Sequence, residues 1–335
     1  MLGGAAMSPT LPWPSAAADE EIRYFRIGTA ATTGTYFQIG GLIANAISKP
    51  PGTRDCDRGG SCGVPGLIAV AQATQGSVEN VAAVGADKFE SALCQSDVAA
   101  WAYSGTGLFK DKPPMKDLRA IAALFPESVH VVARAAAPIH TLKDLKGKRI
   151  GVGEKESGTL VDARLILDAA GILEREIKPD YRNLSRAAEA LGRGELDAFF
   201  LFGGYPVPAI AELAASIPLR LIPITSDIAM RLTRRYRFFS ADVIPGATYA
   251  GVADETPTIS TSALWIVGSA VAETLIYDIT KALWSDANRR ILDGGHPMGK
   301  RIKLENALGG LVLPLHPGAL RFYREAGVAI PPESQ

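Results

Sequence analysis

This sequence has no excess of positive or negative charge, since 35 lysines and arginines balance 35 aspartates and glutamates over 335 residues. Nucleic-acid binding depends on clustered Lys and Arg, and no basic stripe occurs. A helix-turn-helix segment before residue 22, as a DNA-binding regulator would need, is also missing. No apolar run reaches the roughly 20 residues of a membrane helix. The sequence therefore argues against nucleic-acid binding and predicts no membrane span.

Catalytic motifs are missing as well. The four histidines are scattered, with no spacing that places two on one helix face: His130, His140, His296 and His316. No Gly-x-Ser-x-Gly elbow or dinucleotide fingerprint occurs, and GEKESGT (153–159) has Thr159 where a phosphate loop needs Lys. An enzyme on this scaffold would need a reactive Cys, Lys or cofactor site. We therefore predict a protein without catalytic residues, cofactor or metal.

Cysteine is scarce, with three residues in the chain. Cys56 and Cys62 lie in a loop rich in Pro and Gly (50–65), and no second pair completes a metal site. A local disulfide fits best, worth about 2 kcal/mol on the loop-entropy estimate. It implies an oxidising compartment. Cys94 lies in an apolar run and is predicted to be a small buried thiol.

The N-terminal segment suggests export. Residues 1–18 are uncharged, and Ala16–Ala18 resemble a signal-peptidase site. A basic beginning is missing, and prolines interrupt the apolar stretch, so the signal peptide is incomplete. We interpret residues 1–21 as a residual signal or, alternatively, as an ordinary disordered tail.

The length favours two domains, and strand-like and helix-like segments alternate, which predicts parallel sheets covered by helices. Strands are predicted at 23–29, 67–72, 89–95, 119–125, 128–134, 148–153, 177–182, 196–202 and 219–224. Helices are predicted at 35–48, 77–86, 96–104, 159–170, 185–192, 208–216, 226–235, 271–286 and 317–326. The adjacent runs 119–125 and 128–135 predict a crossing between lobes, and the polar segment 240–262 predicts the return. Lobe I is then 22–122 with 236–335, and lobe II is 123–235.

Four stretches share the order of apolar strand, small turn and helix start: 26–41, 90–105, 148–163 and 197–210. Ligands bind where the carboxyl ends of strands gather in an open α/β sheet. Helix N-termini at that edge present unpaired N–H groups that suit carboxylates or phosphates. Hydroxyls there would add donors: Thr32, Thr33, Ser96, Ser157 and Thr159. The alternative is that these residues are helix caps and turn formers.

These stretches resemble the TAXI-type solute receptors of tripartite ATP-independent periplasmic (TRAP) transporters. The resemblance runs from Arg26 to Gly327, and its most specific parts are 27–47, 74–81, 95–103, 143–159, 196–210 and 276–284. It implies an α/β, type II periplasmic binding-protein fold, with two lobes joined by crossing strands around an interlobe cleft. It further implies a periplasmic receptor that delivers glutamate, glutamine or a 2-oxoglutarate-like acid to an ion-gradient-driven membrane permease. A ligand sensor that reports to a signalling partner would share this fold.

The resemblance also implies the ligand-binding residues. Carried over position by position, they are Thr32, Thr33, Gly34, Tyr36, Gln95, Ser96, Ser157, Gly158, Thr159, Gly203, Gly204 and Tyr205. Many relatives have more glycine where this chain has Ala30, Ala31 and Thr32, which reshapes the first wall. Tyr36 is an equally good core residue, and Arg164 fits a solvated helix face better than a ligand contact.

Overall fold

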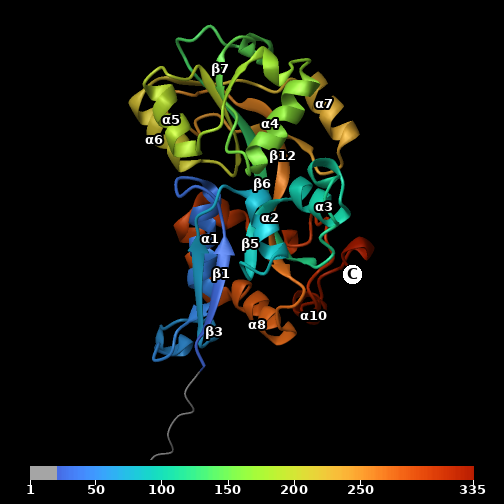
Figure 1. Cartoon of the computed structure of the whole chain (residues 1–335). Helices are drawn as coiled ribbons and strands as arrows, with labels where there is room; N and C mark the ends of the chain where they lie inside the picture. Colours follow the sequence, from blue (N-terminus) through green and yellow to red (C-terminus); the bar gives the residue numbers. More distant parts are fainter. Residues whose placement is uncertain (1–20) are drawn as a thin grey trace, which may run out of the picture.

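Two α/β lobes are stacked and joined by two long strands in the computed structural model (Figure 1). The structure describes residues 21–335, so residues 1–20 of the predicted signal segment lie outside the described residues. The joining strands are β6 (Leu118–Arg134) and β12 (Thr256–Gly268), which pair antiparallel along most of their length. Each of them runs from one lobe into the other, so one continuous sheet links the lobes.

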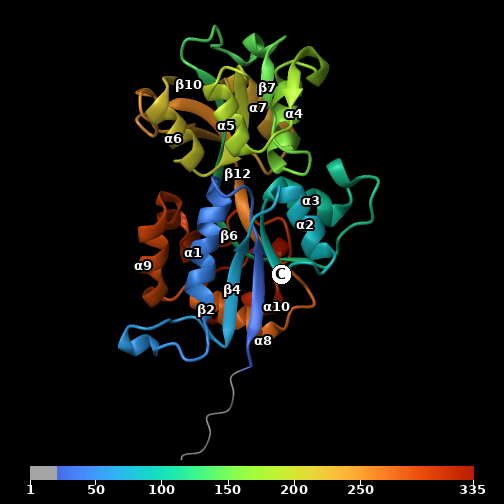
Figure 2. The same ribbon diagram turned by 60° about the vertical axis from the view of Figure 1, so that its left-hand side comes forward.

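Lobe I contains the first part of the chain and its last helices (Figure 2). Its elements are β1 (Arg23–Gly28), α1 (Thr35–Ile47), β2 (Ser48–Lys49), β3 (Val64–Pro65), β4 (Leu67–Gln72), α2 (Ser77–Gly85), β5 (Ser91–Gln95), α3 (Ser96–Ser104), α8 (Glu273–Leu283), α9 (Asp286–Gly295) and α10 (Pro317–Glu325). The elements of lobe II are β7 (Arg149–Gly151), α4 (Gly158–Ala169), β8 (Lys178–Asp180), α5 (Leu184–Gly192), β9 (Ala198–Gly203), α6 (Pro208–Ser216), β10 (Leu219–Leu221), α7 (Ser226–Arg235) and β11 (Ser240–Ile244).

The strand order shows how the lobes are built. It runs β4-β1-β5-β12-β6-β9-β7-β8, with β10 beside β6 and β11 beside β12. In lobe I, β1 pairs in parallel with β4 and β5, while β12 enters antiparallel to β5. In lobe II, β7 pairs in parallel with β8 and β9. The carboxyl ends of these parallel strands face the junction between the lobes, where the helices that follow them begin.

Successive side chains of a strand point to opposite faces of the sheet, and in β6 both faces are buried. Val129 and Val131 on β6 point into one apolar cluster of lobe II, and Val132 points into the cluster on the opposite face. Lobe I has a single larger cluster, in which Trp265 of β12 is fully buried beside Phe25 of β1. Each lobe therefore has its own core.

Most predicted elements occur, and the differences have physical causes. The two runs at 119–125 and 128–134 form one strand, β6, because Pro126 and Glu127 continue the ladder to β12. The strand β12 was not predicted, because its first half (TPTISTS) is polar and crosses the junction. The helix α9, whose sequence is highly charged, was not predicted either. Phe239 and Ile259 pack in lobe II, so the chain returns to lobe I within β12 and not at 236.

The predicted disulfide is confirmed. Cys56 and Cys62 are bonded, with 4.7 Å between their Cα atoms, and Cys94 is a buried free thiol. The loop that carries the bond lies at the end of lobe I farthest from lobe II (Figures 1 and 2). Among residues 21–335, no helix is both long and apolar enough to cross a membrane.

Candidate functional site

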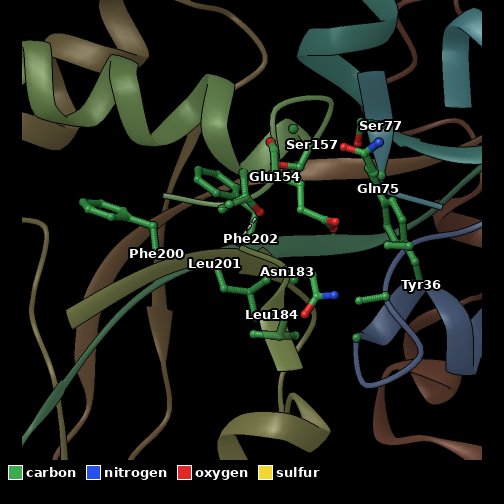
Figure 3. Close-up of a pocket in the computed structure, with 18 of the residues that line it drawn as sticks. Tyr36, Gln75, Ser77, Glu154, Ser157, Asn183, Leu184, Phe200, Leu201 and Phe202 are labelled. Carbon is green, nitrogen blue, oxygen red and sulfur yellow. Dashed lines mark hydrogen bonds between the residues drawn. The ribbon is translucent and has the colours of Figure 1, made fainter. Parts of the chain in front are cut away.

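A pocket lies between the lobes and is lined by both of them (Figure 3). It holds about 710 Å³ of empty space, part of it open to solvent. Lobe I contributes Gly34, Thr35, Tyr36, Gln75, Ser77 and Gln95. Lobe II contributes Glu154, Ser157, Gly158, Thr159, Asn183, Leu184, Phe200, Phe202 and Gly203. Glu127 on the crossing strand β6 also lines the pocket.

The two lobes contact each other around this pocket. The backbone N–H groups of Val78 and Glu79 in lobe I donate to the carbonyl of Glu156 in lobe II, at 3.1 and 3.2 Å. On another side, Trp101 of α3 packs edge-on against Phe238 of lobe II, with 5.2 Å between ring centroids. The structure therefore has a closed arrangement, in which the pocket is covered from both sides.

Four helices begin at the pocket. Their first residues, Thr35 of α1, Ser77 of α2, Gly158 of α4 and Leu184 of α5, all line it. A helix N-terminus carries unpaired N–H groups and a partial positive charge. Four such ends in one pocket offer a small anion several backbone donors, beside the carboxyl of Glu154, which also lines the pocket.

The start of α1 is the most open of these ends. Its N-cap is Gly34, whose extended backbone (φ −95°, ψ 163°) offers no capping side chain. The N–H groups of Thr35 and Tyr36 have no hydrogen-bond partner within the described part of the chain. Two backbone donors are thus available to a ligand in the pocket.

Two of the predicted hydroxyls line the pocket and are already bonded to lobe II itself. Ser157 Oγ caps α4 by accepting from the N–H of Leu160 at 3.2 Å, and it donates to the carbonyl of Glu154 at 2.7 Å. Thr159 Oγ1 accepts from the N–H of Phe202 at 3.4 Å. For Ser157 the alternative interpretation, a helix cap, describes the observed hydrogen bonds.

The other three predicted hydroxyls lie outside this pocket. Ser96 is buried and pairs with the hydroxyl of Thr261 at 2.8 Å. Thr33 pairs across the lobes with the hydroxyl of Ser185 at 2.7 Å. Thr32 is exposed and lines a neighbouring, more open depression. The sequence pattern brings these residues near the junction, but their side chains hold the protein's own groups.

The predicted glycines divide in the same way. Gly34, Gly158 and Gly203 line the pocket. Gly204 lies behind it, where its carbonyl accepts from Thr35 Oγ1 at 2.6 Å. Tyr205 also lies outside the pocket.

Gln95 and Tyr36 line the pocket and are both tied into the protein. Gln95 Nε2 donates to Asp162 of lobe II, and its Oε1 accepts from Ser77 Oγ at 3.3 Å. The Tyr36 hydroxyl donates to Glu127 Oε2 at 2.5 Å. Burial raises the pKa of Glu127 to about 8, so this carboxyl carries a proton at neutral pH. Neither group brings a negative charge into the pocket.

Arg182 and Arg164 form salt bridges with carboxylates of the protein itself. Arg182 lines the pocket, but its guanidinium pairs with Asp180 at 2.7 Å and with Glu195 at 3.3 Å. Arg164 pairs with Glu174 at 2.8 Å on the surface, in agreement with the predicted solvated face. Neither Arg182 nor Arg164 therefore offers an unpaired charge to an anion in this pocket, and the helix N-termini are the donors described above.

Sequence reasoning missed several lining residues. Gln75 and Ser77 belong to the motif 74–81, which was noted for the resemblance but not for the site. Asn183 could have been found as an N-cap before a predicted helix. Glu127 and Phe200 lie within strands and carry no local signal of a site.

The structure has two α/β lobes joined by crossing strands with a pocket between them, so the predicted fold class is confirmed. Over residues 27–327 the chain matches the NMT1-like family and belongs to it. Similar solved structures include the alkanesulfonate-binding protein SsuA from Xanthomonas axonopodis pv. citri bound to MOPS (TM-score 0.49, 14% identity, covering 91% of this chain and 84% of that chain). Another is the periplasmic aliphatic sulphonate binding protein SsuA from Escherichia coli (TM-score 0.47, 13% identity, covering 90% and 82%). At this identity, a ligand does not carry over from one protein to another.

Proposed function

We propose that this protein is an extracytoplasmic solute receptor that captures a small organic acid between its lobes. The observation that carries the proposal is the pocket at which four helices begin, two from each lobe. Lobe closure removes water from a bound ligand and strengthens each hydrogen bond to it. The protein acts by binding, and we assign no catalytic role to any residue.

The walls of the pocket favour an acid with a short carbon chain. The free N–H groups of Thr35 and Tyr36 are placed for a carboxylate. Phe202 and Leu184 supply an apolar wall, and the side-chain amide of Asn183 adds a polar group near it (Figure 3). Glutamate, glutamine and 2-oxoglutarate-like acids have this combination of a carboxylate, a short chain and a second polar end.

The partner and the compartment that we propose rest on the resemblance and on the disulfide. The resemblance to TAXI-type receptors supports delivery to an ion-gradient-driven TRAP permease. The disulfide between Cys56 and Cys62 supports an oxidising compartment, and we therefore place the receptor in the periplasm.

A thermal-shift screen tests this function. Ligand that binds only the folded protein stabilises it by about 2.7 kcal/mol at a hundred times Kd, and its Tm rises accordingly. We expect L-glutamate, L-glutamine or 2-oxoglutarate to raise the Tm, and the corresponding carboxylate methyl esters to do so far less. No shift with any amino acid or dicarboxylate at millimolar concentration would contradict the proposal.

A further inference from the structure

Two carboxyl groups from opposite lobes meet in the closed junction. Asp97 lies in the first turn of α3 in lobe I, and Asp162 lies in α4 of lobe II. Both residues have 0% exposure, and Asp162 Oδ2 accepts from Gln95, which directly precedes α3, so the two carboxyls lie close together and interact. This contact exists only while the lobes are closed, because each lobe supplies one partner.

The hydrogen bonds of this pair are incomplete. Asp162 Oδ2 accepts from Gln95, but Asp162 Oδ1 and both carboxyl oxygens of Asp97 lack a well-formed hydrogen bond among the described residues, although the N–H groups of Asp97 and Val98 lie near the Asp97 carboxyl. The titratable groups that face the pair are Glu127 of β6 and Cys94 of β5, with Tyr36 of α1 behind Glu127. None of these is a cation, so no ion pair compensates the buried acids.

Two ionised carboxylates in contact, buried and without a cation, repel each other strongly. One proton removes the repulsion and supplies a donor: Asp162 Oδ1–H then donates to a carboxylate oxygen of Asp97. The N-terminus of α3 favours the negative charge on Asp97, which leaves Asp162 as the protonated partner. The same proton keeps Asp162 in place as the acceptor for Gln95, which lines the pocket.

We propose that closure of the two lobes binds one proton, held between Asp97 and Asp162, and that opening releases it. The proposal rests on the proposed function only for the step of lobe closure and not for the identity of the ligand. It makes the receptor hold its ligand more tightly in acid and release it more readily as the pH rises.

The direction of the pH effect follows from the burial of the pair. Burial raises the pKa of Asp97 to about 6 and, with the nearby Asp97 charge, raises the pKa of Asp162 well above its usual range. In the open form both carboxyls meet water, with pKa values of about 4. The closed form is therefore favoured fully below pH of about 4, and this advantage is lost as the pH rises through the closed-form pKa. One linked proton changes the closed-to-open ratio about tenfold per pH unit in that window.

Double electron–electron resonance on the ligand-free full chain tests the proposal. Nitroxide labels on the exposed positions Lys88→Cys of lobe I and Arg175→Cys of lobe II report the distance between lobes. We expect mainly closed distances at pH 5 and mainly open distances at pH 8. If the bound ion is a proton, the distances should be the same in sodium and in choline buffers. Closure that depends on sodium would overturn the proposal.

A neutral mimic of the protonated acid sharpens the test. Asp162→Asn donates to Asp97 and accepts from Gln95 at any pH, so we expect closed distances at pH 5 and at pH 8. Asp168→Asn, at an exposed position of the same helix, is the matched control and should keep the wild-type pH dependence. Should Asp162→Asn fail to fold, Asp97→Asn removes the same repulsion and should also remove the pH dependence.

Two results would overturn the proposal: lobe distances of the wild type that do not change with pH, or a pH dependence that persists in both variants. A titration with L-glutamate at each pH separates this proposal from the proposed function. Binding without pH dependence would refute the proton site and leave the receptor function intact.

Discussion

The two lobes present helix N-termini to the same pocket in different ways. In lobe I, α1 and α2 follow the glycines Gly34 and Gly76, and neither helix has a side-chain cap. In lobe II, Ser157 caps α4 and Asn183 caps α5 by accepting from the N–H groups of their own first turns. Lobe I thus leaves donors open at α1, whereas lobe II satisfies part of its own.

This difference assigns different tasks to the lobes. An anion gains more from the uncapped start of α1, so we expect it to bind lobe I first. Lobe II then closes over the ligand through direct contacts with lobe I, such as the bond from Gln95 to Asp162. The predictions that follow compare donors of lobe I with contacts and caps of lobe II.

The largest effect is expected from Gly158→Ala in lobe II. A Cβ at this position would overlap Gln95 Oε1, and Gln95 is held by Ser77 and Asp162. The lobes then cannot close fully, and affinity for the best acid of the screen should fall on the order of a hundredfold, about 3 kcal/mol. Calorimetric titration measures it. Gly41→Ala, with nothing within 4 Å of its added Cβ, is the control and should bind normally.

The next effect concerns the open donors of lobe I. Thr35→Pro removes one N–H at the first position of α1, where proline fits the helix and the extended Gly34 tolerates it. Loss of a hydrogen bond to a carboxylate should weaken binding by about 1.5–3 kcal/mol, roughly ten- to hundredfold. Thr35→Ala keeps the N–H and loses only the hydroxyl bonded to Gly204, so it should retain most of the affinity. Equal losses in both variants would refute the role of the N–H group.

A smaller effect is expected from removal of the disulfide, which lies in lobe I far from the pocket. Replacing Cys56 and Cys62 by Ser should lower the free energy of unfolding by about 2 kcal/mol on the loop-entropy estimate. Ligand affinity should not change. Alkylation of the unfolded, unreduced wild type should modify one cysteine, Cys94. Three modified cysteines would show that the protein was not oxidised.

The smallest effect is expected from Ser157→Ala. Because Ser157 Oγ caps α4, its loss should lower the free energy of unfolding by about 1 kcal/mol. Binding should weaken less than in Thr35→Pro. Denaturant unfolding and calorimetry measure the two quantities. A tenfold loss of affinity at unchanged stability would instead make the Ser157 hydroxyl a ligand donor, as the sequence pattern suggested.

The sequence predicted the architecture better than the site. Alternating strands and helices, the crossing near 119–135 and the disulfide were all readable, because apolar periodicity and cysteine spacing are local signals. The strand β12 was not, since its polar half is stabilised by pairing with residues far away in sequence. Turn residues such as Ser157 and Gly158 were found at the pocket edge by their position after strands.

Side-chain partners were the part that could not be predicted. Ser96 and Thr33 have the residue types and positions of ligand donors, yet each bonds a hydroxyl more than 150 residues away, at Thr261 and Ser185. Asp97 and Asp162 looked like ordinary residues of helix starts, and only the closed lobes bring them together. Contacts across the junction depend on the whole fold and leave no local pattern.

Hydrogen exchange of the first turns of α1 and α4 tests the central claim, that one ligand is held by both lobes. With saturating ligand from the screen, mass spectrometry should show slower exchange at Thr35 and Tyr36 in lobe I and at Gly158 and Thr159 in lobe II. Peptides from the disulfide loop 50–65, remote from the pocket, should exchange as before. Protection confined to one lobe would contradict the account.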